Sequence, residues 1–143
     1  MYKSILVATD FSSAADAAVA RAADLVKLTG AGLTILHVLE HFPEDIPNDS
    51  IAPENTDPEK YYTDKASIKL QEITKLLESG NVSTKVLTST HSAGREIADY
   101  ASGKGMDLII VGGHGKRGIL GMAGSTASSV LHAATVDVLV VKN

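Results

Sequence analysis

The sequence predicts an α/β domain in which helices cover both faces of a parallel sheet. Segments with strand character alternate with segments of helical period, which is the pattern of βαβ units. Three strand segments, ILVA, LIIV and VLVV, are almost continuously apolar, as expected for parallel strands that are buried on both sides. At 143 residues the chain has the length of one domain, so we expect residues 1–143 to form a single domain.

The first part of the chain predicts a strand, a helix and a second strand. Residues 2–9 (YKSILVAT) are rich in types that favour strands. The capping-box spacing of Ser13 and Asp16 predicts the start of a helix, and apolar residues then recur at helical period. Gly30 predicts the end of this helix, and residues 33–39 (LTILHVL) predict the next strand.

The middle of the chain predicts a long loop and then an amphipathic helix. Residues 40–58 contain four prolines, several acids and no periodicity. A loop of this length is typical of a functional flap or a disordered segment. Residues 59–78 have helical period, and the positions expected to face the core are Ala66, Leu70, Ile73 and Leu77.

The last part of the chain predicts three further strands and two helices. The expected strands are residues 82–89, 108–111 and 136–141. The expected helices, each lying between two of these strands, are residues 93–102 and 126–134. Together with the first two strands this gives a five-stranded sheet.

Composition and charge limit the classes of function. A net charge of −4, with few and scattered aromatic residues, argues against nucleic-acid binding, which requires a basic face. The absence of cysteine excludes disulfides and thiolate sites. The opening MYKSILVATD has too short an apolar run for a signal peptide, and no stretch approaches the roughly 20 apolar residues of a membrane span. We therefore expect a cytoplasmic protein without membrane or nucleic-acid partners.

A glycine-rich segment after the fourth strand is the most informative part of the chain. The strand LIIV leads into glycines at positions 112, 113, 115, 118, 121 and 124, and after Ser125 the predicted helix begins at Thr126. Glycine lets a ligand approach the backbone closely, and unpaired N–H groups at a helix start favour an anion. The segment therefore predicts a phosphate site, although glycines also mark ordinary turns. Lys116 and Arg117 are either solvated charges or further phosphate contacts.

The end of the first strand supplies a second group of polar residues. Ligands of open α/β sheets bind beyond the carboxyl ends of the strands, where the strand order reverses. If the first and fourth strands are neighbours, Asp10 faces the same crevice as the glycine segment. Its carboxylate could accept a ribose hydroxyl or help hold a phosphate-bound cation, and it could equally cap the following helix.

Sharper catalytic motifs do not fit the sequence. A Walker A motif and a GxSxG elbow are both absent, so Ser125 is a poor candidate for a nucleophile. Residues 113–118 spell GxGxxG, but they follow the fourth strand and lack the acid that would hold a ribose. The histidines lack metal-ligand spacing. His37 lies inside an apolar strand, so we interpret it as a core or edge residue. We therefore expect no catalytic residue, no metal held by protein ligands alone, and at most slow hydrolysis.

Four segments together resemble the universal stress protein family. They are ILVATDFS (5–12), LTILHV (33–38), MDLIIVGGHG (106–115) and TVDVLVVK (135–142), and they extend over nearly the whole chain. The ATP-binding branch of that family carries the motif G-x2-G-x9-G-(S/T). Gly112 and Gly115 match its beginning, and Gly124 with Ser125 matches its end, with eight residues in place of nine between them.

The resemblance implies an adenine nucleotide alpha hydrolase-like fold with strand order 3-2-1-4-5, and it implies an ATP site. Adenine and ribose would lie against Ala8, Thr9 and Asp10, and Val38 would pack on the base. His114 would lie beside the phosphates, with Mg²⁺ held through them. The residues expected to donate to the phosphates are Gly112, Gly115, Gly124, Ser125 and Thr126.

The last strand predicts self-association. In the family's strand order it lies at a sheet edge, and VDVLVV has a single charge, so it is suited to pair with another chain. We expect a homodimer through Val136, Val138 and Val140. The resemblance implies an ATP-binding regulatory module of the stress response. The alternative is an A-type universal stress protein, which binds no nucleotide and acts as a dimeric protein-interaction module.

Overall fold

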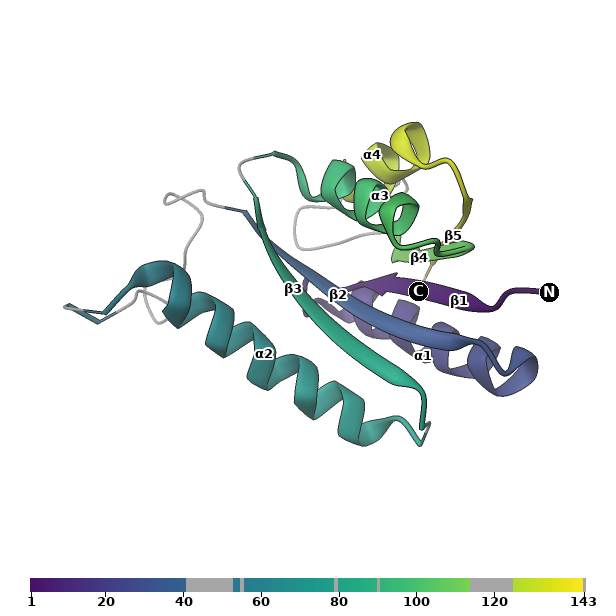
Figure 1. The fold of residues 1–143 in the computed structure, drawn as a ribbon, viewed down its shortest axis with the longest axis horizontal. Helices are drawn as coiled ribbons and strands as arrows, with labels where there is room; N and C mark the ends of the chain where they lie inside the picture. The colour runs from purple at the N-terminus through teal and green to yellow at the C-terminus, as the bar shows by residue number, and fades with distance from the viewer. Residues whose placement is uncertain (41–52, 55, 79, 90, 114–124, 143) are drawn as a thin grey trace.

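The protein is built around one five-stranded parallel sheet in the order β3-β2-β1-β4-β5 (Figure 1). The computed structural model describes residues 1–40, 53–54, 56–78, 80–89, 91–113 and 125–142. The strands are β1 (Ser4–Ala8), β2 (Gly32–Glu40), β3 (Val82–Ser89), β4 (Leu108–Gly112) and β5 (Asp137–Val141). The helices are α1 (Ser13–Thr29), α2 (Pro58–Leu76), α3 (Ala93–Gly103) and α4 (Ser125–Ala133). The predicted fold class and strand order are confirmed.

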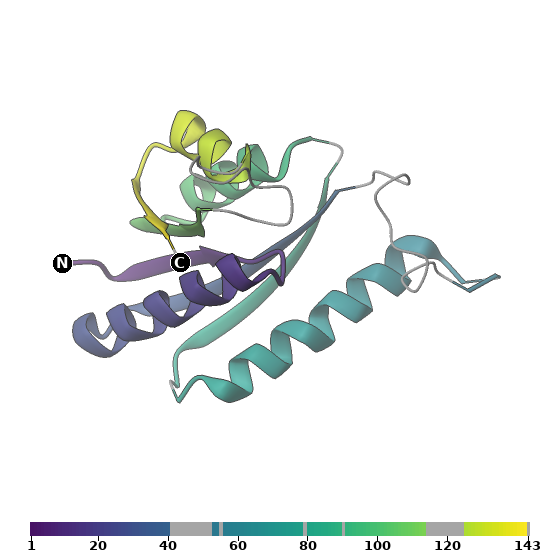
Figure 2. The same ribbon diagram turned by 180° about the vertical axis from the view of Figure 1, so that it is seen from behind.

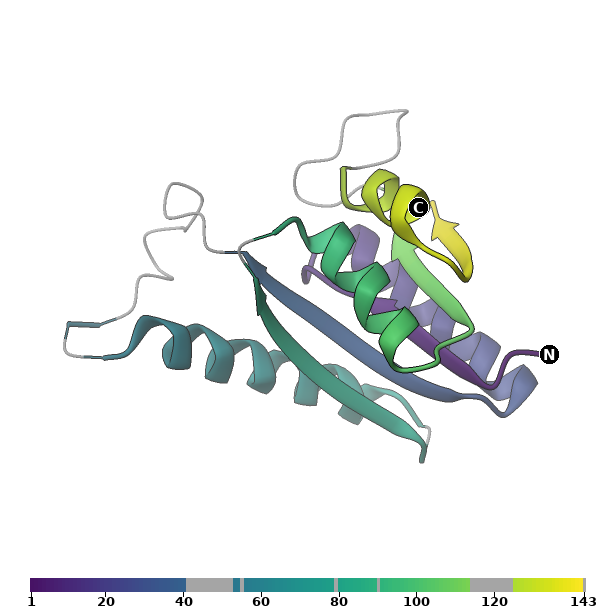
Figure 3. The ribbon, with the colours of Figure 1, turned by 45° about the horizontal axis from the view of Figure 1, so that its top comes forward.

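Helices cover both faces of the sheet, so the core has two halves. Helices α1 and α2 lie on one face, and α3 and α4 lie on the other, as Figure 2 and Figure 3 show from two further directions. On the first face, apolar residues of α1 and α2 pack against Ile5, Val7 and Ile35. On the second face, α3 and α4 pack against Leu6, Leu36 and the other strand residues whose side chains point away from the first face. The near-continuous apolar strands follow from this double burial.

The element boundaries differ from the predicted ones by one or two residues at most ends. At the start of α1, Ser12 and not Ser13 is the cap, because the Ser12 hydroxyl accepts a hydrogen bond from the Ala15 N–H. Leu77, predicted inside α2, is the extended residue that ends this helix. Gly103 lies within α3, and Gly105, with φ of 67°, makes the turn that follows.

The predicted loop at residues 40–58 falls mostly outside the described residues. Glu40 is the last residue of β2, and Pro58 is the first residue of α2. Asp57 caps α2, and proline fits the first turn because the N–H groups there have no helical partner.

The strand order places the carboxyl ends of β1 and β4 side by side. Val7 of β1 pairs with Ile35 of β2 on one side and with Ile110 of β4 on the other. The chain leaves β1 toward β2 and later returns to add β4 on the opposite side, so the order reverses between β1 and β4. The N-termini of α1, α3 and α4 lie at this same edge, since each helix runs antiparallel to the strands.

Carboxylates hold the amino ends of the strands at the opposite edge. The Asp107 side chain accepts hydrogen bonds from the Lys3 N–H (2.8 Å) and the Ser4 N–H (3.2 Å). The Tyr2 hydroxyl donates to Asp137 at 2.7 Å, and this bond raises the pKa of Tyr2 above its usual value. These contacts join β1 to β4 and β5 at the edge far from the predicted site.

Within the ranges that the structure describes, none of the helices is long and apolar enough to cross a membrane.

Candidate functional site

The turn between β1 and α1 is built from successive bonds between side chains and backbone. The Thr9 hydroxyl accepts from the Phe11 N–H (3.0 Å), and the Asp10 carboxylate accepts from the Ser12 N–H (3.0 Å). The Ser12 hydroxyl then caps α1. Threonine, aspartate and serine favour such turns because their short side chains reach the backbone two or three residues on. The turn therefore presents Asp10 at the carboxyl edge of the sheet in a defined position.

Phe11 adopts a backbone conformation that non-glycine residues rarely take. Its φ is 64°, in the left-handed region, which costs roughly 1–2 kcal/mol for an L-residue. The surrounding contacts must offset this cost. The Phe11 ring packs on the His37 ring with the centroids 4.5 Å apart, and the Lys69 ammonium lies 5.0 Å from the Phe11 ring centroid. Residues of β2 and α2 thus hold the turn from the first face of the sheet.

His37 is half-buried and contacts the backbone of the same turn. Its Nδ1 lies 2.7 Å from the Thr9 carbonyl oxygen, so the ring nitrogen donates to that oxygen. The sequence predicts His37 as a core or edge histidine, and its hydrogen bond agrees with that interpretation. The sequence alone does not indicate its contact with the predicted binding turn, because that contact depends on the register between β1 and β2.

The end of β4 is shaped by close packing. A Cβ added at Gly112 would lie 2.7 Å from the carbonyl oxygen of Ala14, in the first turn of α1. The Gly113 N–H donates to the Val141 carbonyl oxygen (2.8 Å) and joins the end of β4 to β5. Gly112, predicted as a phosphate contact, is therefore required by helix packing whether or not a ligand binds.

Gly94 brings α3 against the first turns of α4. A Cβ added at Gly94 would lie 2.3 Å from the Ser129 Cβ and 3.0 Å from the Thr126 carbonyl oxygen. The position of the α4 N-terminus thus depends on a glycine in α3 that sequence reasoning missed. The available signal was a glycine in the first turn of a helical segment. Glycine weakens a helix, so its presence there indicates a position where close packing excludes a larger side chain.

The structure brings most of the described site residues to one edge of the sheet. Ala8 pairs with Leu36, and β2 continues to Glu40, so Val38 lies beyond the end of β1. Ala8 and Val38 both pack on the face covered by α3 and α4. Thr126 is exposed in the first turn of α4, and Ser125 is the first residue of that helix. His114, Gly115 and Gly124, and the cations Lys116 and Arg117, lie outside the described residues.

The charges near the helix starts distinguish α4 from the other helices. Acidic residues occupy the first turns of α1, α2 and α3, namely Asp16, Glu59 and Glu96. Among the described helices, α4 alone has no acidic residue in its first turn. Its partial positive end is not neutralised by carboxylates of that turn, so it is the helix start best suited to an anion.

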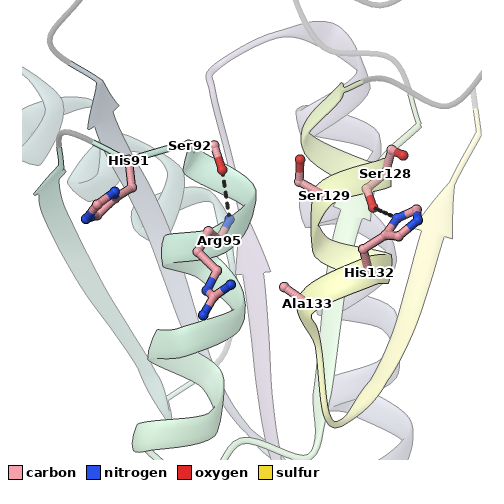
Figure 4. Close-up of a pocket in the computed structure, with 7 residues that line it drawn as sticks. All are labelled: His91, Ser92, Arg95, Ser128, Ser129, His132 and Ala133. Atoms are coloured by element: carbon pink, nitrogen blue, oxygen red, sulfur yellow. Dashed lines mark hydrogen bonds between the residues drawn. The ribbon is translucent and has the colours of Figure 1, made fainter.

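A polar groove of about 490 Å³ lies on the outer side of α3 and α4 (Figure 4). Its lining side chains do not converge on one point: His91, Arg95 and His132 point in different directions. The Arg95 guanidinium lies 3.3 Å from Asp99, and His132 Nδ1 donates to the Ser128 carbonyl oxygen. In the described part of the chain, no three histidine or acidic side chains are grouped to hold a metal ion. The groove contains none of the predicted site residues.

Comparison with known proteins shows relatives along the entire chain. The sequence profile of the universal stress protein family matches residues 1–142. Universal stress protein A homologs 2 and 1 of Coxiella burnetii are 34% and 31% identical to the chain, over 99% and 98% of its length and 95% and 96% of theirs. Universal stress protein MJ0577 of Methanocaldococcus jannaschii is 30% identical over 99% of the chain and 96% of its own length.

Solved structures show the same fold. The structure of MJ0577 matches with a TM-score of 0.79 and covers 100% of this chain and 97% of its own. A universal stress protein solved in complex with cAMP matches at 0.66, with 21% identity, 98% of this chain and 96% of its own. A universal stress protein of Archaeoglobus fulgidus in complex with dAMP matches at 0.65, with 23% identity and 97% of each chain. The profile match and the full-length relatives agree with the segments that carry the resemblance: this chain belongs to the universal stress protein family.

Proposed function

We propose that this chain binds an adenine nucleotide, with ATP the expected ligand, and serves as a regulatory module of the stress response. The site is the carboxyl edge of the sheet between β1 and β4. The observation that carries the proposal is the meeting of two features at this edge. A hydrogen-bonded turn presents Asp10, and α4 begins without an acidic residue in its first turn.

Each part of the site suits one part of the nucleotide. The Asp10 carboxylate has lone pairs for more than one donor, so it can hold the Ser12 N–H and also accept from a ribose hydroxyl. Val38, half-buried beyond the end of β1, offers an apolar side chain to the base. The first amides of α4 and the Thr126 hydroxyl can donate to phosphate oxygens. Bound Mg²⁺ would neutralise phosphate charge and would be held through the phosphates.

The relatives support the adenine class of ligand. Two structural neighbours that share the fold were solved with cAMP and with dAMP. In this chain the strand order places the carboxyl ends of β1 and β4 side by side, at the edge where we propose the site. We expect ATP turnover to be slow at most, since the sequence shows no general base near the glycine-rich segment.

Titration calorimetry with ATP and Mg²⁺ tests the proposal. The variant Thr126→Val removes one hydroxyl with little change in shape, and we expect it to bind ATP about tenfold more weakly. The matched control is Thr135→Val, because Thr135 is also exposed but lies before β5, at the opposite edge. GTP in place of ATP tests whether the base is recognised. A wild-type protein without any heat of ATP binding would overturn the proposal.

We also propose that the chain forms a homodimer through β5. This strand has a neighbour on only one side of the described sheet, so its outer backbone groups are available to another chain. Val136, Val138 and Val140 are half-buried there, against the second half of the core. A dimer formed through this edge would leave the nucleotide site open at the carboxyl edge of the sheet.

Analytical ultracentrifugation tests the dimer. The double variant Val138→Lys and Val140→Lys should sediment as a monomer, because two ammonium groups would have to enter the interface. Ile68→Lys is the control, since Ile68 is 62% exposed on α2, which packs against β3 at the other side of the sheet. Circular dichroism establishes that each variant is folded. A folded double variant that remains dimeric would place the interface elsewhere.

A further inference from the structure

We infer that His37 acts as a positioning residue for nucleotide binding. It holds the turn of residues 9–12 in the conformation that presents Asp10 to the nucleotide. This inference rests on the proposed function. His37 lies on the face of the sheet that α1 and α2 cover, where Phe11 also packs. It therefore acts through the turn and not by touching the base, which we place against Val38 on the opposite face.

The hydrogen bond to Thr9 is the first contact by which His37 holds the turn. Thr9 lies one residue beyond the end of β1 and is 5% exposed. Its N–H donates to the Leu36 carbonyl oxygen (2.9 Å), and its carbonyl oxygen accepts from His37 Nδ1 (2.7 Å). Consecutive residues of β2 thus hold both backbone groups of Thr9. A buried carbonyl deprived of its donor destabilises the conformation that buries it.

The second contact is the one with Phe11. The His37 and Phe11 rings are tilted by 35° with their centroids 4.5 Å apart. Phe11 has the left-handed backbone conformation, so it needs tertiary contacts to remain there. His37 therefore holds the turn at two points, at the Thr9 carbonyl by a hydrogen bond and at the Phe11 ring by packing.

Asp10 lies between these two points. It is flanked by Thr9 and Phe11, and its carboxylate accepts from the Ser12 N–H. The backbone direction at residues 9 and 11 decides where that carboxylate is placed. Without His37, the turn gains freedom, and Asp10 must be ordered again when a nucleotide binds. The expected result is weaker binding without any lost contact to the ligand.

The alternation along β2 explains why adjacent residues serve one site from two faces. Successive side chains of a strand point to opposite faces. Val38 packs with the residues beneath α3 and α4, while the His37 ring lies beside Phe11 on the other face. One residue contacts the base in our proposal, and the one before it orders the turn.

Three variants separate this role from a general effect on folding. His37→Leu removes the donor and keeps an apolar side chain, whereas His37→Asn keeps an amide donor near the position of Nδ1. His132→Leu is the matched control, because His132 Nδ1 also donates to a backbone carbonyl, that of Ser128, at 2.9 Å. His132 lies in the last turn of α4, away from the turn after β1.

Two measurements are made on each variant. The first is hydrogen exchange at the Phe11 and Ser12 amides of the nucleotide-free protein, with Ile109 and Ile110 in the core as reporters of global unfolding. The second is the dissociation constant for ATP. In His37→Leu we expect about tenfold faster exchange at the turn and about tenfold weaker ATP binding, with the core amides unchanged. His37→Asn should recover part of both effects, and His132→Leu should match the wild type.

The outcomes keep the two proposals apart. Wild-type protein that binds no ATP overturns the proposed function, while the exchange data still decide whether His37 holds the turn. Unchanged exchange at Phe11 and Ser12 in His37→Leu overturns the ordering role. Faster exchange together with unchanged ATP affinity overturns the link between the turn and binding.

Discussion

The carboxyl ends of β1 and β4 are neighbours in the sheet, yet they are built in opposite ways. The end of β1 is shaped by polar side chains. The hydroxyl of Thr9 and the carboxylate of Asp10 each accept a hydrogen bond from a backbone N–H. The end of β4 is shaped by the absence of a side chain, because α1 packs directly against Gly112. The first kind of end can be weakened one hydrogen bond at a time, whereas the second tolerates almost no added volume. The two ends therefore differ in how substitutions affect them.

The largest effect should come from adding volume at the end of β4. In Gly112→Ala the new Cβ meets Ala14 backbone atoms at 2.7 and 2.8 Å, and backbone cannot rotate away. We expect a loss of about 3 kcal/mol in the free energy of unfolding, measured in urea. Gly113→Ala is the control, since its nearest contact is at 3.3 Å. Equal losses in both variants would contradict the packing role of Gly112.

A smaller effect is expected where α3 meets α4. Gly94→Ala places a Cβ 2.3 Å from the Ser129 Cβ, so the helices must separate and the free energy of unfolding should fall by about 2 kcal/mol. Gly103 lies in the same helix with no atom within 4 Å of an added Cβ. Gly103→Ala should leave stability unchanged or raise it by up to about 1 kcal/mol. Urea unfolding of the two variants measures both changes. A loss of stability in Gly103→Ala but not in Gly94→Ala would contradict the packing role of Gly94.

Removing one polar group at the end of β1 should cost less again. Ser12→Ala removes the cap of α1 and should lower the free energy of unfolding by about 1 kcal/mol. Ser13→Ala should change it by less than about 0.5 kcal/mol, because Ser13 is an exposed residue of the first turn. Thermal and urea unfolding of both variants test this. A larger loss of stability in Ser13→Ala than in Ser12→Ala would instead identify Ser13 as the cap of α1.

The smallest effect on the protein is expected from a substitution at the opposite edge of the sheet, where Tyr2 contacts Asp137. The hydrogen bond to Asp137 raises the pKa of Tyr2, so Asp137→Asn should lower that pKa toward its usual value in an ultraviolet absorbance titration. The native state of the wild type binds the tyrosine proton more tightly than the unfolded state does. The associated stability is present below the unfolded pKa of about 10 and is lost as the pH rises through the higher native pKa. ATP affinity at neutral pH should not change, and a change would connect this edge to the site.

Sequence reasoning predicted the fold because each element carries its own local signal. The apolar strands, the helical periods and the residues between them were enough to predict five strands and four helices. The boundaries moved where several residues could serve equally, as with Ser12 and Ser13. For the site, the sequence indicated the polar residues after β1, and the structure places Asp10 at the expected edge. The roles assigned to the predicted site residues stay predictions.

The remaining features depend on contacts between distant segments. The bond from His37 to Thr9 requires a particular register between β1 and β2, which the periodicity of either strand does not determine. Gly112 shows a second limit. A glycine at a strand end permits close approach, but the sequence does not tell whether a ligand or a helix approaches. Here α1 does, and Gly94 has the same relation to α4.

The most direct test of the proposed site is a map of amide chemical-shift changes in isotope-labelled protein as ATP and Mg²⁺ are added. We expect the largest changes at residues 9–12, at Val38 and Gly113, and at Thr126, because these lie around the carboxyl ends of β1 and β4 and the start of α4. Changes confined to the groove on α3 and α4, around Arg95 and His132, would contradict the proposed site. So would a spectrum that ATP leaves unchanged.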